Sequence, residues 1–340
     1  MNFWRVVRVL VIARNKEFYR DQGVMIWSLF FPFLIVAAVA FAFSDESQTV
    51  FKVGVYSSET GMTLKTPLLQ QRFIDRIDYK DFDKALDRVK NFQLDLLLSE
   101  DSPDYYWIND ESPSSQAVEQ LFLATNQTAV LQRQTVAGRE VRYVDWVFPG
   151  VLGMNLMFGS LFGIGFVIVR YRKNGVLKRI QATPVTPLQF LSAQVLSRLL
   201  LMVVVSVIIY IGCDLFLDFI MLGNFLDLII VALLGSFSMI AFALIVASRT
   251  ASEELANGLL NLATFPMMLL SEVWFSLDDA PDWLNTVSQF LPLTHTVQAA
   301  REIMLSGTSL GSLGYHVWML VAMCVIFLFI ASILFRWNEP

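Results

Sequence analysis

Long uncharged hydrophobic runs, separated by charged segments, dominate the pattern of this 340-residue chain. A helical run of about 20 apolar residues spans the hydrocarbon core of a bilayer. Between the first two runs lies a hydrophilic block, 44–145. The pattern predicts a mainly α-helical membrane protein with six transmembrane helices, over 24–43, 147–169, 190–217, 228–248, 255–271 and 318–335.

Residues 1–23 mix basic and apolar side chains at a helical period. At about 100° per residue, Arg5, Arg8, Asn15 and Lys16 gather on one side. We expect an amphipathic helix that lies in the membrane interface, and the alternative is a plain cytoplasmic flank of the first span. The residues assigned to this helix as functional candidates are Trp4, Arg5, Arg8, Arg14 and Arg20.

The hydrophilic block 44–145 has the pattern of a small α/β domain. Apolar segments of strand length occur at 51–56, 94–98 and 105–108. Helical spacing of apolar residues occurs at 81–90 and 116–131. A block of about 100 residues is long enough for a modest core of its own.

The segment 275–307 has neither the composition of a span nor that of an ordinary loop. Trp283 and Phe290 stand among prolines and acids, and aromatic residues of this kind favour the boundary between water and lipid. We interpret the segment as a partly re-entrant hairpin. A surface loop is the alternative, because irregular backbone at membrane depth must be buried in protein.

The charge distribution predicts the orientation in the membrane. Residues 1–23 and 170–187 are basic, whereas Asp218, Asp278, Asp279 and Asp282 make the loops after the third and fifth runs acidic. Lys and Arg are retained on the cytoplasmic side of a membrane. We therefore expect both termini in the cytoplasm and the block 44–145 outside.

The composition agrees with a membrane protein. The chain is 55% hydrophobic, above the roughly 45–50% of soluble domains, and its formal net charge of −5 arises mainly in the block 44–145. Its two cysteines, Cys213 and Cys324, lie in separate apolar runs, so we expect no disulfide.

The chemistry-bearing residues predict no catalytic or cofactor site. His295 and His316 are the only histidines, and no thiols accompany them at the spacing of zinc ligands. We expect neither enzymatic activity, nor a cofactor, nor nucleic-acid binding in this chain. An intramembrane enzyme using His295, Asp214 or Glu272 is the weaker alternative.

Arg198, Asp214 and Glu272 stand near the ends of predicted spans, where ionised groups are costly unless they reach water or a partner. Snorkelling to the interface explains them, and a polar lining for a transported group is the sharper alternative. With Trp274 and His295 they form the candidate translocation path or exit.

The basic loop 171–187 is punctuated by Gly175 and by the Thr-Pro pairs at 183–187, which predicts an ordered segment on which a partner docks. Its sequence and several others resemble the permease subunit of ATP-binding-cassette type-2 exporters, in the subgroup with a large external domain after the first span. The segments that carry this resemblance are ARNKE at 13–17 with RD at 20–21 and Pro32, RKNGVL at 172–177, ATPVT at 182–186, FPMMLLS at 265–271, PDWL at 281–284, LPLTH at 291–295 and AR at 300–301.

The resemblance implies a permease driven by a separate ATPase. It makes 1–23 an elbow helix, 171–187 a coupling helix and 275–307 an external hairpin, with ATP and Mg bound by two copies of the partner. It also implies a second permease, contact with membrane lipid, a bacterial inner-membrane location and a possible periplasmic adaptor. The residues it assigns to coupling are Tyr171, Arg172, Lys173, Gly175, Leu177, Lys178, Arg179 and Pro184.

Three functions stay open at this point. The first is export of an amphipathic or lipid-like substrate or drug. The second, within the same family, is lipid release or transmission of force to an external assembly. The third is an external ligand sensor anchored in the membrane, which no visible site supports.

Overall fold

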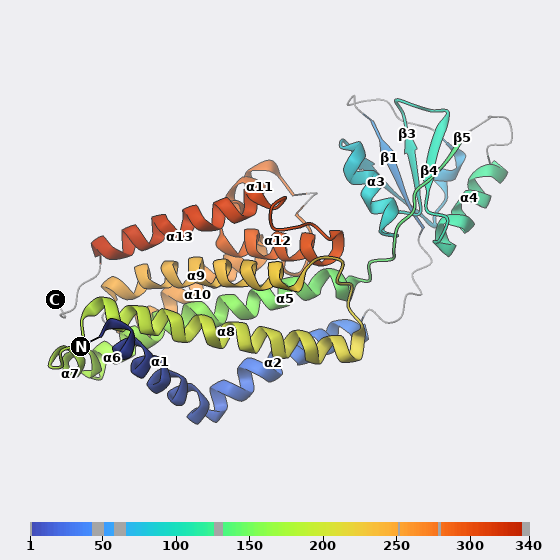
Figure 1. Ribbon diagram of the computed structural model, residues 1–340. Coiled ribbons are helices and arrows are strands. Elements are labelled where there is room, and N and C mark those ends of the chain that lie inside the picture. Colours follow the sequence, from blue (N-terminus) through green and yellow to red (C-terminus); the bar gives the residue numbers. More distant parts are fainter. Residues whose placement is uncertain are drawn as a thin grey trace. The chain divides into compact units, whose positions relative to one another are not determined.

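The computed structural model describes residues 2–42, 51–57, 66–125, 132–250, 252–277 and 280–334. The chain forms two compact units, one made of Met1–Phe43 with Tyr143–Pro340 and the other of Ser44–Arg142. The first unit is helical and the second contains the sheet (Figure 1). We call them the helical unit and the sheet unit.

The helical unit consists of helices that run side by side (Figure 1). Its second predicted span is one continuous helix, in which a π-helical stretch, η2, joins α5 to α6. The helices are α1 (Phe3–Arg20), α2 (Gln22–Ala42), α5 (Tyr143–Ser160), η2 (Leu161–Phe166), α6 (Val167–Lys173), α7 (Val176–Gln181), α8 (Pro187–Leu217), α9 (Phe225–Arg249), α10 (Glu253–Leu270), α11 (Asp282–Ser288), α12 (Pro292–Ser306) and α13 (Gly314–Leu334).

Five of the six predicted spans coincide with helices that are long and apolar enough to cross a membrane. The predicted span 255–271 does form a helix, α10, but two glutamates and two asparagines lower its hydropathy. Within the described part of the chain, a count of six spans is therefore not confirmed. The five helical segments are Met25–Ala42, Tyr143–Lys173, Pro187–Leu217, Phe225–Ser248 and Gly314–Leu334.

The sheet unit is built on five strands in the order β2-β1-β3-β4-β5. All pairs are parallel except β3 with β4. Its elements are β1 (Phe51–Tyr56), η1 (Pro67–Gln70), β2 (Ile74–Tyr79), α3 (Phe82–Lys90), β3 (Leu96–Ser99), β4 (Tyr105–Ile108), α4 (Pro113–Thr125) and β5 (Gln132–Thr135).

The two faces of this sheet are covered by different helices (Figure 1). Leu96 and Leu98 pack with Val118 and Phe122 of α4, whereas Leu97, between them, packs with α3. This alternation is the period of two of a β-strand. The predicted small α/β domain is confirmed as a three-layer α/β/α arrangement.

The sequence prediction missed two strands of this unit. Strand β2 has the sequence IDRIDY and β5 has QRQT, so neither presents the apolar run that marks a buried strand. The predicted helix 116–131 begins earlier, at Pro113, and ends at Thr125. Residues 126–131 of that prediction lie outside the described residues, as do Asp278 and Asp279 of the predicted acidic loop.

Candidate functional site

The segment 171–187 is ordered and contains the short helix α7, which lies between the end of α6 and the start of α8. Helix α6 ends at Lys173, and Gly175 takes a left-handed conformation with φ of 68° before α7 begins. Thr186 and Gln189 then form a capping box that starts α8. The left-handed position explains the glycine, because other residues adopt it at a cost.

Three consecutive residues at the end of α6 fix this segment to three other helices. The Tyr171 hydroxyl donates to Glu17 of α1. The buried Arg172 guanidinium donates through Nη1 to the carbonyls of Ala247, at 3.0 Å, and Thr250, at 2.7 Å, at the end of α9. The Lys173 amine lies 3.7–3.8 Å from the carboxylates of two glutamates that begin α10.

The short helix α7 presents the exposed part of the predicted coupling residues. Leu177 is buried beneath it, whereas Lys178, Arg179 and Pro184 are exposed. No atom lies within 4 Å of a Cβ built on Gly175. Because Arg172 is buried and donates to the carbonyls at the end of α9, it is not open to a partner. The exposed surface of this segment is made by α7 and the turn after it.

Helix α1 packs against α8 along its apolar face. Val7 and Val11 contact Ala193, and Phe18 contacts Leu201 and Met202. The predicted candidates on the other face are exposed: Trp4, at 70%, together with Arg5, Arg8 and Arg20. An amphipathic helix with this exposed face is the geometry expected of an interfacial element.

Arg14 does not share that exposed face, since it joins a polar cluster with Glu17, Arg170 and Tyr171 that we call the elbow cluster. Its Nη1 lies 2.6 Å from Glu17 Oε2, and Arg170 Nη2 lies 3.3 Å from Glu17 Oε1. Burial alone raises the pKa of Glu17, but hydrogen bonds from Tyr171 and Arg14 and the charges of Arg14 and Arg170 lower it below its ordinary value.

Glu272 and Trp274 belong to a second cluster, which contains an arginine to which the sequence prediction gave no site role. Arg301 Nη1 lies 3.1 Å from Glu272 Oε2, and its Nη2 donates to the Glu272 carbonyl at 2.8 Å. The guanidinium carbon stands 3.8 Å from the centre of the Trp146 ring. Tyr143 donates to the Trp274 carbonyl at 2.5 Å. We call these five residues the Glu272 cluster.

Asp214 and His295 have separate structural partners. The Asp214 carboxylate accepts from the Phe219 amide at 3.1 Å and so closes the end of α8. His295 is fully buried, with Nε2 2.9 Å from the Gln289 carbonyl and Nδ1 3.1 Å from Nδ1 of His316. The five predicted path residues therefore do not form one site.

Arg198 and Trp274 do line a common cavity of about 630 Å³, which we call the elbow cavity. Its wall comes mainly from α1, α2, α5, η2 and α8. The charged side chains that line it are Arg14, Glu17, Asp21, Arg170 and Arg198. The wall is otherwise mainly apolar, and its volume is in the usual range of small-molecule sites.

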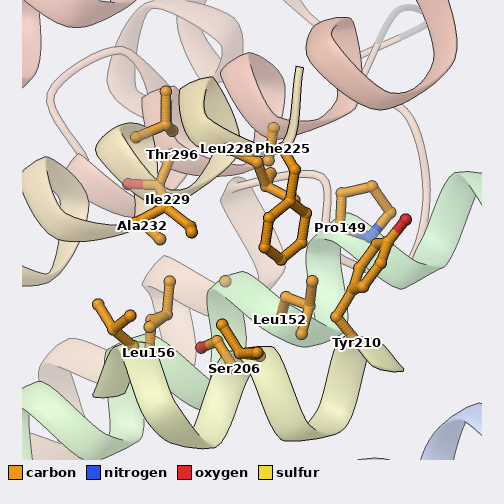
Figure 2. A pocket seen from close by; sticks show the side chains of 15 residues that line it. Pro149, Leu152, Leu156, Ser206, Tyr210, Phe225, Leu228, Ile229, Ala232 and Thr296 are labelled. Carbon is orange, nitrogen blue, oxygen red and sulfur yellow. The ribbon is translucent and has the colours of Figure 1, made fainter. Parts of the chain in front are cut away.

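A second pocket, between α5, α8 and α9, is far smaller, at about 40 Å³ (Figure 2). Leu152, Phe225 and Leu228 are among the apolar side chains around it, and the Ser206 hydroxyl has no hydrogen-bond partner in the described structure. This pocket has room for little more than water. Across the described ranges, no three His, Cys, Asp or Glu side chains are grouped to hold a metal ion.

Two comparisons with known proteins give matches. A family model described as ABC-2 family transporter protein matches residues 23–333. Nodulation protein J of Rhizobium meliloti (strain 1021) is 31% identical over 107 residues, which are 32% of this chain and 40% of that protein. The chain thus spans well under half the length of that curated relative.

Proposed function

Because the chain belongs to the ABC-2 family of transporters, as a permease subunit, we propose that it exports an amphipathic or lipid-like substrate or drug across a bacterial cytoplasmic membrane. A separate ATPase, present in two copies, would bind ATP and Mg and supply the energy. The substrate would cross between helices of this chain and of a second permease, identical or homologous.

The observation that carries this proposal is the exposed helix α7, held on a segment that is fixed to α1, α9 and α10. A partner that presses on α7 would move these helices together. Lys178 and Arg179 offer it two exposed basic side chains on one short helix. We assign ATPase docking to α7 and the turn that follows it.

The proposed orientation places α7 and both termini in the cytoplasm and the sheet unit outside, where it could meet a periplasmic adaptor. The basic segments 1–23 and 170–187 support this orientation through the preference of Lys and Arg for the cytoplasmic side. Labelling of an Asn174→Cys variant in intact cells tests it. Cys213 and Cys324 are both buried, so the engineered thiol is expected to dominate the signal of a permeant reagent and to resist an impermeant one.

A second permease is supported by the uncovered surface of α2. Only 11% of the apolar window Met25–Ala42 is buried, against 67% for the most apolar 18-residue window of the helix Tyr143–Lys173. Trp27 and Phe30 are among the exposed large side chains of α2. Lipid and a second copy of the permease are the two apolar surroundings that suit this helix.

Charge reversal on α7 tests the docking assignment. We expect Lys178→Glu with Arg179→Glu to abolish co-purification of the ATPase and ATP-dependent efflux, because repulsion would replace attraction at the contact. The matched control reverses two exposed basic residues of the sheet unit, Arg72→Glu with Lys80→Glu, and should leave both readouts intact. Unchanged association and efflux in the α7 variant would show that the ATPase docks elsewhere.

A further inference from the structure

Arg198 of α8 differs from the other arginines of the elbow cavity in having no acidic partner. Its side chain is more than nine-tenths buried, and its Nε donates to the Gly159 carbonyl. Among the described residues it forms no ion pair, whereas Arg14 and Arg170 both pair with Glu17. A buried guanidinium without a carboxylate is costly, so its charge calls for another partner.

Two glycines, Gly159 and Gly163, leave the space that the Arg198 side chain occupies at the cavity wall. A Cβ on Gly163 would collide with the Arg198 guanidinium, and one on Gly159 would collide with Met202 and come within 3.2 Å of Arg198 Nη2. The Gly163 carbonyl also accepts from Arg14 Nη2 at 3.3 Å. Arginines from α1 and α8 thus meet backbone carbonyls one helical turn apart, on the same side of the cavity.

The charges that line the cavity leave one positive charge uncompensated. Arg14, Arg170 and Arg198 face Glu17 and Asp21, and Glu17 already accepts from Arg14 and Arg170. Arg198 has no carboxylate within ion-pair distance among the described residues, so its guanidinium lacks a counter-charge at the wall. A cationic ligand would be repelled here, and a ligand with one negative charge would restore neutrality.

The rest of the wall suits a hydrocarbon chain. Aromatic rings and methionines surround the space beyond Arg198, and they come from helices on different sides of the cavity. Aromatic rings in this wall include Phe18, Trp27, Phe31, Phe158, Phe162 and Phe166. Burial of a chain against them is favourable in proportion to the apolar area removed from water.

We propose that the elbow cavity binds an amphiphile with a single anionic headgroup, which Arg198 holds by charge-assisted hydrogen bonds while the chain lies against the aromatic wall. The proposal rests on the proposed function, because it names the substrate class that such an exporter would accept. Both a phosphodiester and a carboxylate meet the requirement for one negative charge. A bare inorganic anion does not use the apolar wall.

The test measures equilibrium binding of four probes to the purified chain in an uncharged detergent, without ATPase or ATP. The probes are lauroyl-lysophosphatidylglycerol, the zwitterionic lauroyl-lysophosphatidylcholine, and inorganic phosphate as a competitor. Laurate serves as the carboxylate arm. We expect the anionic lysolipid to bind at least about tenfold more tightly than the zwitterionic one, because the excess positive charge of the wall repels the choline cation of the latter. We expect phosphate to compete poorly.

Three variants locate the interaction. Arg198→Gln should lose about tenfold in affinity for lauroyl-lysophosphatidylglycerol and keep its affinity for lauroyl-lysophosphatidylcholine, which also reports that the cavity is folded. Arg198→Lys should retain most of the anionic preference. Lys16→Gln, which removes an exposed positive charge of α1, should change neither affinity.

Equal binding of the two lysolipids to the native chain would overturn the proposal without the need for any variant. Competition by phosphate as strong as by the anionic lysolipid would overturn it too, since the apolar wall would then contribute nothing. If Arg198→Gln does not fold, the proposal is still tested by the ratio of the two lysolipid affinities in the native chain and in Arg198→Lys. Because no ATPase takes part, a negative result leaves the docking of α7 untouched, and a failure of that docking leaves this binding test intact.

Discussion

The elbow cluster and the Glu272 cluster use the same chemical pair, glutamate with arginine, in different surroundings. Glu17 and Arg170 are each 40% exposed, whereas Glu272 is 15% and Arg301 12% exposed. The elbow cluster joins α1 to the end of α6, and the Glu272 cluster joins the turn after α10 to α12 and α5. Similar ion pairs thus stand in two surroundings, one partly open to water and one mostly buried.

The physical reason for this difference is the solvent. Water competes with an exposed ion pair and reduces its net contribution to about 0–1 kcal/mol. In a buried pair, removal of one partner leaves a desolvated charge, and that is strongly destabilising. An element that moves during transport is better held by the first kind of contact, and the proposed motion of α1 agrees with this.

The largest effect is expected at the Glu272 cluster. Arg301→Met should lower the free energy of unfolding by about 3 kcal/mol, near the lower end of the range for buried pairs, because it leaves the mostly buried Glu272 carboxylate without its counter-charge. It also removes the cation–π contact with Trp146. Thermal unfolding in detergent measures the change.

The matched control for this prediction is Arg133→Met in the sheet unit, where Arg133 is 41% exposed and pairs with Glu119. This control should cost about 1 kcal/mol or less. Adding Glu272→Gln to the Arg301→Met variant should recover part of the loss, because no buried charge then remains unpaired. A loss below about 1 kcal/mol in Arg301→Met would contradict the contrast between the two clusters.

A smaller effect is expected at the elbow cluster. Glu17→Gln should lower the free energy of unfolding by roughly 0.5–1 kcal/mol at neutral pH, after allowance for solvent screening of this partly exposed group. Because the pKa of Glu17 is lower in the folded chain, its contribution is present above the unfolded value and is lost as the pH falls through the folded one.

The difference between the native chain and Glu17→Gln should therefore shrink below about pH 4.5, the ordinary value for this group. Melting temperatures of the two proteins, recorded from neutral pH downward, measure it. A gap that stays constant across this range would mean that the Glu17 charge does not stabilise the fold.

The smallest effect is expected for Arg170→Gln. Glu17 keeps its contacts with Arg14 and Tyr171 in this variant, so a loss of a few tenths of a kcal/mol is expected. Chemical unfolding curves of Arg170→Gln and Glu17→Gln show which variant loses more free energy of unfolding. If Arg170→Gln were the more damaging variant, the assignment of Glu17 as the centre of the cluster would be wrong.

Hydropathy made five spans predictable, because a bilayer demands apolar length whatever the tertiary structure. The sheet unit was harder to predict, since β2 and β5 are polar strands that other strands hold in place. The pairing of Arg301 with Glu272 could not be predicted, because the two residues stand 29 positions apart. Arg172 was predicted to face a partner, and only the position of α9 reveals that it is buried.

The cavity around Arg198 could be anticipated only in part. The sequence shows Arg198 near the start of a predicted span, and Gly159 and Gly163 in the predicted span before it. It could not reveal that the glycines leave room for this guanidinium, or that the neighbouring arginines already share a glutamate. Both facts depend on the approach of α1 and α8 to η2.

The three consecutive anchors at the end of α6 have a mechanical consequence. Successive side chains of a helix point about 100° apart, so Tyr171, Arg172 and Lys173 each reach a different neighbour. A displacement of α7 would therefore be transmitted to α1, α9 and α10 at the same time. Removal of any one of these contacts would reduce the displacement of the helix that it reaches and leave the other two contacts in place.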